Sequence, residues 1–488
     1  MGYVGESVQP LAEADPERLA LSCGPRTLTR RQLSDEILCL ARALGSRLPE
    51  GGRVALYLED PIRLLIGFFA AARAGAVAMV YDPAWPDRRR QWIETQTRPS
   101  VILDERSFPA LMAKGTALRE PTDAAGAAPA ADAPFYAGFT SGSTGDPKGY
   151  CRSHRSWLDS FAVSAAEFAI GEADRVLIPG NMVHSLHLYG AVHGIASGAV
   201  VEIAERFNPR WLAARLRAEG PSVLYATPTQ IHYMAGELRR SGAAEGVRLV
   251  LASGAKWREA DRRAMASVFP CARLVEFYGA SEMSFITISA PEDNPPDGSV
   301  GRAAYGVGIS IRSENQEELP AGETGAIWVR SSMLFDGYIC GGGSEIAREN
   351  GWLTVGDRGW LDENGFLYLA GREKRMIITS GLNIYPEEVE QVLLSHEDVA
   401  LAAVVAKRDP VRGAALVAVV QTETGSGLGG AGLRRHCLTL LGRSRTPRAF
   451  LFLDAMPLTP GGKIDLKQLE AMVTEGKTPP AAPEGLKV

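Results

Sequence analysis

The chain has 488 residues, of which 45% are hydrophobic and 22% are charged. This composition is typical of a globular protein with a large core, and the length suits about two to four domains. The net charge of −5 argues against general affinity for nucleic acid or anionic lipid. The six cysteines include no C-x-x-C pair, and the most apolar run, Leu64 to Val80, is short and interrupted by Arg73 and Gly75. We therefore expect a cytoplasmic protein without a disulfide framework, a zinc site or a membrane span.

The N-terminal part of the chain predicts a βαβ unit. Apolar residues at helical spacing run from Leu33 to Leu44. Val54 to Leu58 then has the pattern of a strand, Pro61 to Arg73 that of a helix, and Ala76 to Val80 that of a second strand. This order implies a parallel sheet with helices packed on it.

Strands and helices alternate again in the middle of the chain. The β-rich runs are Arg175 to Ile178, Ala199 to Ile203, Ser222 to Ala226, Arg248 to Leu251 and Arg273 to Phe277. The helical patterns between them are Leu188 to Ile195, Trp211 to Ala218, Pro228 to Leu238 and Trp257 to Val268. This alternation predicts a doubly wound sheet, in which ligands bind in the loops beyond the carboxyl ends of the strands.

The last third of the chain changes pattern twice. Strand-like runs punctuated by glycine predict a small β-subdomain from Ser299 to Tyr338. A new α+β pattern begins at Pro386, and we place the main domain boundary near Arg372 to Met376. The predicted fold is therefore α/β, with a large N-terminal domain and a small α+β C-terminal domain.

A stretch rich in glycine and hydroxyl side chains, Phe139 to Gly149, precedes the second group of strands. Glycines allow backbone amides to face an anion, hydroxyls add donors, and Lys148 adds a positive charge. The stretch does not fit the P-loop pattern, because Pro147 stands at the second glycine position and Gly149 follows the lysine. It is either a phosphate-binding loop of another kind or a flexible linker.

Four further motifs follow this stretch in order: Tyr278-Gly279-Ala280-Ser281-Glu282, Gly356-Asp357-Arg358-Gly359-Trp360, Gly371-Arg372-Glu373-Lys374 and Pro460-Gly461-Gly462-Lys463. Together with Phe139 to Gly149 they resemble the adenylate-forming (ANL) superfamily of AMP-dependent synthetases and ligases. The resemblance spans roughly Leu28 to Leu469 and is closest to bacterial fatty-acid-type acyl-CoA synthetases. It implies an AMP-binding domain over residues 1–373 and a mobile lid domain over residues 374–488. The implied reaction uses ATP and Mg²⁺ to form an acyl-adenylate and pyrophosphate, and then passes the acyl group to coenzyme A.

The resemblance also implies roles for individual residues in nucleotide binding. It places the phosphates of ATP on Thr140, Ser141, Gly142, Ser143, Thr144, Gly145 and Lys148. Tyr278 would stack on adenine opposite Gly254 and Ala255, Asp357 would accept the ribose hydroxyls, and Arg372 would contact the nucleotide near the ribose and phosphate. The set is completed by Glu276, Phe277, Gly279 and Ser281.

The catalytic residues implied by the resemblance are Lys463, Glu282 and His184. Lys463 would offset charge on the α-phosphate and the substrate carboxylate, while Glu282 would hold Mg²⁺ with Ser143 or Thr144 as a second contact. Lys374 would be the hinge about which the small domain rotates. The rotated domain would present Ser380, Gly381 and Leu382 to the thiol step.

The substrate follows from the residues expected around the acyl group: Val183, His184, Leu188, Ser253, Gly279 and Phe285. Asn181 to Gly190 contains no acidic residue to pair with an ammonium group, which disfavours an α-amino acid. We expect an aliphatic or aryl carboxylic acid and coenzyme A as partners, with no nucleic acid. An adenylation enzyme that loads a carrier protein is the alternative, and a non-catalytic nucleotide-binding protein is a more distant one. The sequence leaves the chain length of the acid and the oligomeric state open.

Overall fold

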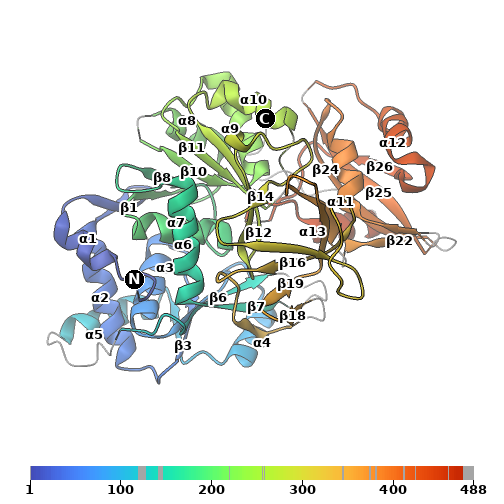
Figure 1. Cartoon of the computed structure of the whole chain (residues 1–488). Coiled ribbons are helices and arrows are strands. Elements are labelled where there is room, and N and C mark those ends of the chain that lie inside the picture. Colours follow the sequence, from blue (N-terminus) through green and yellow to red (C-terminus); the bar gives the residue numbers. More distant parts are fainter. Residues whose placement is uncertain are drawn as a thin grey trace.

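The computed structural model describes residues 2–118, 128–140, 147–218, 220–254, 257, 259–342, 346–372, 375–379, 382–409, 413–423, 425–459 and 461–475. A large domain with two β-sheets and a β-subdomain is followed by a small α+β domain (Figure 1). The predicted α/β fold class is therefore confirmed. Within the described residues, every helix is too short or too polar to cross a membrane.

The first sheet contains the five strands predicted for the middle of the chain. They form its parallel centre together with β1, and antiparallel strands close both edges. In spatial order, the nine strands are β14 (Arg302–Ala303), β13 (Ser284–Ser289), β12 (Arg273–Ala280), β11 (Leu249–Ala252), β10 (Val223–Ala226), β8 (Arg175–Ile178), β9 (Val200–Ile203), β1 (Leu19–Cys23) and β2 (Arg26–Thr29).

Helices cover both faces of this sheet, as its alternating sequence predicts. One face packs on a core cluster with α8 (Pro209–Arg217), α9 (Pro228–Ser241) and α10 (Glu259–Val268). The other face packs on α7 (Ser185–Ala196), which buries almost every residue because it lies inside the main core of the large domain. A short 3₁₀ helix, Pro291–Asp293, follows β13.

The second sheet contains the predicted βαβ unit. Its order is β17 (Gly337–Cys340), β7 (Lys148–Ser153), β6 (Pro134–Thr140), β4 (Val77–Val80), β3 (Arg53–Tyr57) and β5 (Val101–Asp104). Strands β5, β3, β4 and β6 are parallel, whereas β7 and β17 are antiparallel to their neighbours. The remaining helices of the large domain are α1 (Val8–Ala14), α2 (Arg30–Gly45), α3 (Pro61–Arg73), α4 (Asp87–Thr97), α5 (Ser107–Ala117) and α6 (His154–Phe168).

The β-subdomain differs in extent from the prediction. Its sheet consists of β15 (Gly308–Arg312), β16 (Gly325–Arg330), β18 (Ala347–Glu349), β19 (Trp352–Thr354), β20 (Asp357–Leu361) and β21 (Leu367–Arg372). The predicted range, Ser299 to Tyr338, was wrong at its C-terminal end. Strands after residue 346 pair with β16, while β17 leaves the subdomain to pair with β7.

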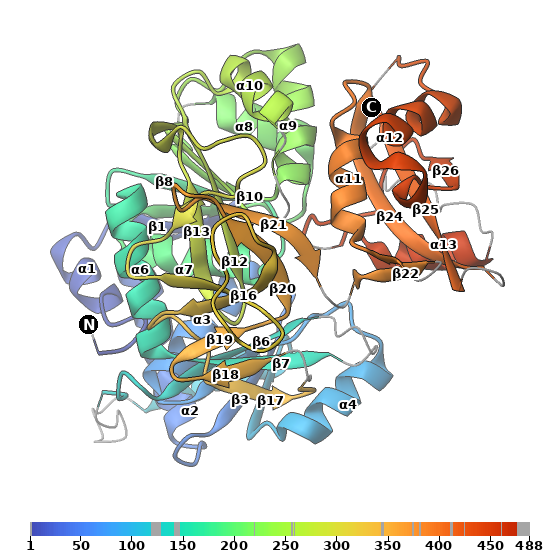
Figure 2. The same ribbon diagram turned by 45° about the vertical axis from the view of Figure 1, so that its right-hand side comes forward.

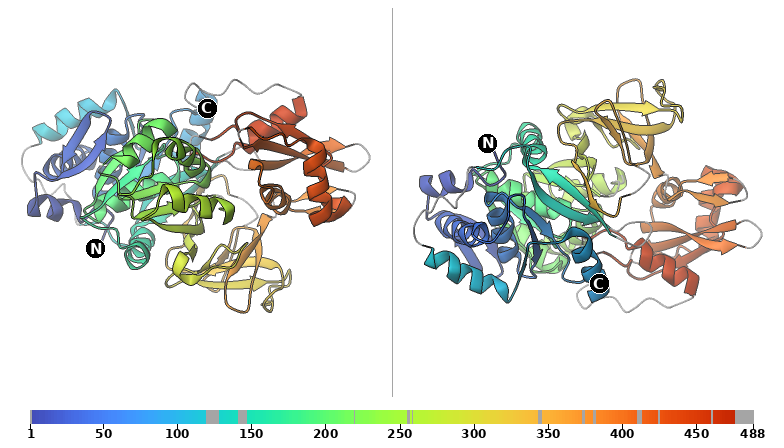
Figure 3. Two further views of the ribbon diagram at one scale, coloured as in Figure 1. Left: turned by 90° about the horizontal axis from the view of Figure 1, so that it is seen from above. Right: turned by 90° about the horizontal axis from the view of Figure 1, so that it is seen from below.

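The small domain forms a separate lobe beside the large one (Figures 2 and 3). Its hairpin of β22 (Ile377–Thr379) and β23 (Leu382–Ile384) precedes α11 (Pro386–Leu394). A three-stranded sheet of β24 (Val399–Asp409), β25 (Gly413–Thr422) and β26 (Ala449–Phe452) carries α12 (Gly430–Arg445) and α13 (Leu466–Glu475). One core cluster of this sheet also includes Tyr233 of α9, so the two domains touch through apolar side chains. The domain boundary between residues 373 and 374 stays a prediction, because both lie outside the described residues.

Candidate active site

The ends of the phosphate-loop stretch are held by adjacent antiparallel strands. Thr140 ends β6 and lies opposite Lys148, the first residue of β7. Strand pairing therefore places the two ends of the stretch side by side. Other predicted site residues lie outside the described part of the chain: Ser141, Gly142, Ser143, Thr144, Gly145, Ala255, Lys374, Ser380 and Gly381.

Three predicted nucleotide residues meet at the carboxylate of Asp357. Tyr278 donates a hydrogen bond of 2.5 Å from its hydroxyl to Asp357 Oδ2, and Arg372 Nε lies 2.8 Å from Asp357 Oδ1. The arginine is opposite the aspartate in the β20–β21 ladder, so strand pairing sets their distance. Asp357 is buried, whereas the Arg372 side chain is 58% exposed. Burial and the nearby carboxylate raise the pKa of Tyr278 well above its ordinary value, so its hydroxyl stays a donor.

The carboxylate of Glu282 accepts a hydrogen bond from a tyrosine that the sequence analysis missed. Tyr338 Oη lies 2.9 Å from Glu282 Oε1, and the Lys148 ammonium lies 5.6 Å from the centre of the Tyr338 ring. Tyr338 is on β17 and lies opposite Tyr150 of β7. The strand that leaves the phosphate loop therefore positions both the lysine and the partner of Glu282.

Lys463 reaches this region from the small domain. A Cβ atom added to Gly254 would lie only 2.5 Å from Lys463 Cε, so the lysine side chain runs directly against the backbone after β11. Burial by the surrounding protein and the nearby Arg372 lower the pKa of Lys463 to about 8, and Glu282 acts in the opposite direction. Part of the lysine side chain nevertheless remains exposed to solvent. The lysine thus joins Arg372 and Glu282 in one electrostatic site.

The histidine predicted for the acyl pocket lies under the same loop. A Cβ atom on Gly461 would lie 2.5 Å from His184 Cδ2. Burial, His187 and Lys463 lower the pKa of His184 to about 3, so its ring is neutral at pH 7. Its Nε2 atom is buried and has no hydrogen-bond partner within the described residues.

Several other predicted residues are part of the packing around the site. Val183, Leu188 and Phe285 belong to the main core, and Phe285 packs against Phe277 with ring centres 4.8 Å apart. Their predicted contact with an acyl group stays a prediction, as does that of Ser253 and Gly279. The predicted role of Leu382 in the thiol step also stays a prediction.

The carboxylate of Glu276 binds two groups of the protein itself. It accepts a hydrogen bond from Trp257 N, and Glu276 Oε2 lies 3.1 Å from Arg262 Nη2. Its predicted contact with the nucleotide also stays a prediction.

A second residue that the sequence analysis missed is Arg152, whose side chain is buried. Its guanidinium donates to the carbonyls of Ser281 and Met333, at 2.9 and 2.8 Å, and to the hydroxyl of Ser284 at 2.7 Å. Two of these acceptors, Ser281 and Ser284, flank Glu282 in the sequence. Arg152 therefore fastens the Glu282 turn to β7.

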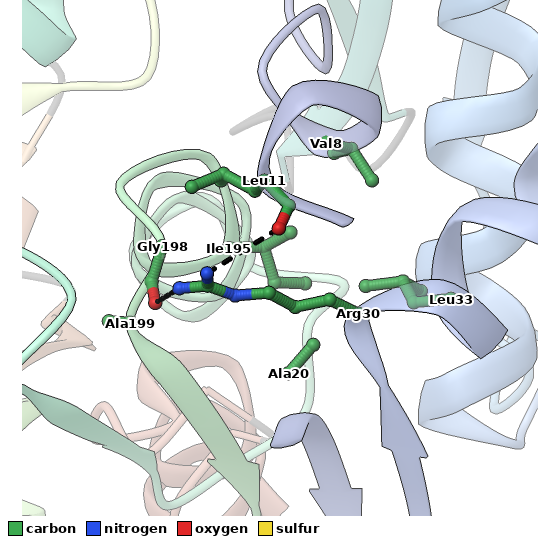
Figure 4. A pocket seen from close by; sticks show the side chains of 8 residues that line it. All are labelled: Val8, Leu11, Ala20, Arg30, Leu33, Ile195, Gly198 and Ala199. Atoms are coloured by element: carbon green, nitrogen blue, oxygen red, sulfur yellow. Dashed lines mark hydrogen bonds between the residues drawn. The ribbon is translucent and has the colours of Figure 1, made fainter. Parts of the chain in front are cut away.

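A small pocket near the N-terminus lies among α1, α2 and the end of α7 (Figure 4). The buried Arg30 crosses it and donates to the carbonyls of Gly198, at 2.8 Å, and Leu11, at 3.5 Å. Because protein carbonyls accept these bonds, we assign this pocket a structural role.

Comparison with known proteins identifies the family. Residues 8–339 match the family described as AMP-binding enzyme, and residues 388–463 match the AMP-binding enzyme C-terminal domain. The chain belongs to this family of AMP-binding enzymes. The family predicted from the motifs is therefore confirmed.

The similar proteins include two that are named as ligases of coenzyme A. An uncharacterized acyl–CoA ligase, YhfT of Bacillus subtilis, is 36% identical over 95% of this chain and 97% of its own length. Sulfoacetate–CoA ligase of Cupriavidus necator is 30% identical over 88% of each chain. The structure of ATP-bound MatB from Rhodopseudomonas palustris superposes with a TM-score of 0.82 over 97% of this chain and 99% of that one, at 24% identity. The last comparison shows the shared fold.

Proposed function

We propose that this protein is an AMP-forming acid–thiol ligase that activates a carboxylic acid with ATP and transfers the acyl group to coenzyme A. Its relatives named as acyl–CoA ligases and its family support this class. The observation that carries the proposal is the position of Lys463. A loop of the small domain brings this cation to Gly254, close to Glu282 and Arg372 of the large domain.

The first half-reaction needs positioning and charge stabilisation rather than a protein nucleophile. A carboxylate oxygen of the substrate attacks the α-phosphorus of ATP, and the bond to the bridging oxygen of pyrophosphate breaks. Lys463 offsets the negative charge of the substrate carboxylate and the α-phosphate as they approach each other. Asp357 accepts hydrogen bonds from the ribose, while Thr140 and Lys148 hold the departing pyrophosphate.

Glu282 suits a magnesium ion whose other ligands are phosphate oxygens and water. Glu282 offers one carboxylate, of which Oε1 is already hydrogen-bonded by Tyr338. Mg²⁺ commonly binds one or two protein carboxylates, with phosphate oxygens and water completing its octahedron. In the part of the chain that the structure describes, no cluster of three possible ligands forms a closed metal site. We propose that Glu282 holds Mg²⁺, which when bound neutralises phosphate charge.

The second half-reaction, in which a thiol attacks the acyl-adenylate and AMP leaves, requires Lys463 to make way. Two arginines support a hinge at Lys374. Arg372 pairs with Asp357 of the large domain, whereas Arg375 pairs with Glu390 of the small domain at 2.7 Å. Since residues 372 and 375 are fastened to different domains, a rotation between them would separate the domains at that point. We propose that Ser380, Gly381 and Leu382 then reach the thiol site.

The proposed substrate is an aliphatic or aryl carboxylic acid. His184 is neutral and Asn181 to Gly190 offers no carboxylate, so an α-ammonium group would lack a partner. The core side chains of Val183, Leu188 and Phe285 suit an apolar acyl group.

The test is acid-dependent exchange of labelled pyrophosphate into ATP across a panel of aliphatic, aryl and amino acids, followed by thioester formation with coenzyme A. We expect exchange with a non-amino acid and a thioester with free coenzyme A. No exchange with any acid would contradict the proposed activity. If exchange occurs but the acyl group passes only to a phosphopantetheinyl carrier protein, the acceptor is that protein and not coenzyme A.

A further inference from the structure

Two helices of the large domain begin with the same Thr-x-x-Gln capping box. In α2, Thr29 Oγ1 accepts from Gln32 N at 3.3 Å, and Gln32 Oε1 accepts from Thr29 N at 2.9 Å. In α9, Thr227 and Gln230 form the same two bonds at 3.3 and 3.0 Å. A capping box uses the threonine oxygen as an acceptor and leaves the hydroxyl proton available for another bond.

The hydroxyl proton of the α9 cap is used by the small domain. Thr227 Oγ1 donates a buried hydrogen bond of 2.8 Å to the carbonyl oxygen of Gly462, the residue before Lys463. This bond crosses 235 residues of sequence and joins the two domains.

Gly461 and Gly462, which precede Lys463, fit against Gln230 and His184 only because glycine has no side chain. Gly462 has φ of +75°, and a Cβ atom on it would lie 2.6 Å from Gln230 Cδ. A Cβ atom on Gly461 would collide with His184 in the same way. The cap of α9 and the ring of His184 thus form a seat for the two glycines, and the seated loop directs Lys463 to Gly254.

We propose that Thr227 is a positioning residue for adenylation, whose hydroxyl holds the Gly461–Lys463 loop in the position where Lys463 enters the site. The proposal rests on the proposed function. The N-terminal cap of α9 then stabilises the domain position in which Lys463 lies against Gly254. Because the thiol step requires the loop to leave, the hydroxyl contributes to the first half-reaction and not to the second.

The experiment compares Thr227→Val with Thr227→Ser and the matched control Thr29→Val. Both valine variants lose a helix cap, and thermal unfolding measures that loss in each. We expect Thr227→Val to slow acid-dependent pyrophosphate exchange about five- to tenfold, the effect of one buried hydrogen bond. Thioester formation from a synthetic acyl-adenylate and coenzyme A stays within about twofold of wild type. Thr227→Ser restores exchange, and Thr29→Val changes neither half-reaction.

A second variant approaches the same contact from the small domain. Gly462→Ala adds a methyl group against Gln230 at a residue with positive φ, so the loop cannot seat. We expect the same separation, with exchange lost and thioester formation retained. Equal losses in both half-reactions, or a Thr227→Val enzyme with full exchange, would overturn the proposal.

A chemical readout makes the test independent of turnover. The rate at which acetic anhydride modifies Lys463, followed by mass spectrometry against pH, reports the pKa of that amine. In the seated loop it titrates near pH 8. In Thr227→Val we expect the midpoint to move towards the ordinary lysine value, while Thr29→Val leaves it unchanged. An unchanged midpoint in Thr227→Val would contradict the proposal even if the wild-type protein activated no acid, so the two failures are distinguishable.

Discussion

Arg152 Nη2 donates a hydrogen bond of 2.7 Å to Ser284 Oγ, and so ties the strand after the phosphate loop to the turn that carries Glu282. The backbone of Ser284 has φ of +58°, which is unfavourable for any residue other than glycine. The buried guanidinium donates to the Ser281 carbonyl before Glu282 and to the Ser284 hydroxyl after it, and so holds this turn in place.

Arg152→Met is expected to weaken ATP binding as well as stability. The substitution leaves buried carbonyls unpaired, at about 1–3 kcal/mol for each group, and releases the Glu282 turn. We expect a higher KM for ATP in pyrophosphate exchange and a lower urea midpoint. Arg30→Met is the matched control, since Arg30 is also buried and also donates to carbonyls. An equal rise in the KM for ATP in both variants would show that the effect comes from lost stability alone.

The adenylation rate is expected to fall as the pH rises through about 8. The pKa of Lys463 is lowered to about 8, so the ammonium form is present below that pH and is lost above it. Only the charged form offsets the charge of the phosphate and carboxylate. The measurement is the exchange rate between about pH 6.5 and 9.5.

Two Lys463 variants test the assignment of this pH dependence. Lys463→Arg stays charged throughout the range, so its exchange rate, though reduced by altered geometry, should no longer fall near pH 8. Lys463→Ala should reduce exchange by about 10²–10³-fold, as for other lost charge-stabilising groups. Wild-type exchange in Lys463→Ala would refute the role of the lysine.

Tyr278→Phe and Asp357→Asn are expected to weaken nucleotide binding to different degrees. The aspartate variant loses the charge that Arg372 faces and an acceptor for the ribose, so we expect about a 10–100-fold loss of affinity, the effect of a charge-assisted hydrogen bond. The tyrosine variant loses one hydroxyl and should lose less. Calorimetric titration with AMP measures both. Tyr368 lies on β21 beside β20, and Tyr368→Phe, which removes a hydrogen bond from a tyrosine hydroxyl to Asp362, serves as the control.

Tyr338→Phe is expected to raise the magnesium concentration needed for half-maximal exchange. The hydroxyl fixes one oxygen of Glu282, and without it the carboxylate can rotate away from the phosphates. We expect a shift of about three- to tenfold, less than the full effect of a hydrogen bond to a charged group, because the carboxylate itself remains. EDTA should abolish exchange in both enzymes, and added Mg²⁺ should restore it. If the exchange rates of wild type and Tyr338→Phe depend on the Mg²⁺ concentration in the same way, Tyr338 does not position Glu282 for Mg²⁺.

Local patterns predicted the regular elements well, because each element carries its own periodicity. Strand β8 (Arg175–Ile178) and helix α3 (Pro61–Arg73) begin and end as predicted. The motifs also indicated which distant residues meet, since Tyr278, Asp357 and Arg372 lie together at one carboxylate. The missed residues depend on partners far along the chain. The Arg152 acceptors lie 129 to 181 residues away, apart from Ser156, and Cys151-Arg152-Ser153 gives no sign of a buried cation.

Strand pairing explains the other omissions. Tyr338 reaches Glu282 only because β17 leaves the subdomain for β7, and nothing in Gly337–Cys340 specifies that partner. The capping box at Thr227 is visible as Thr-Pro-Thr-Gln, but its contact with Gly462 requires the domain arrangement.

The Asp357–Arg372 pair has a consequence for product release. Each carboxylate oxygen of Asp357 has one protein partner, and a second lone pair on each remains for a ribose hydroxyl. Arg372 stands three residues before Arg375, which is anchored in the small domain. Ribose occupancy and the position of the small domain are then thermodynamically linked, and the linkage is reciprocal. A domain position that draws Arg372 away from Asp357 would favour the release of AMP, and a bound nucleotide would oppose that position to the same degree.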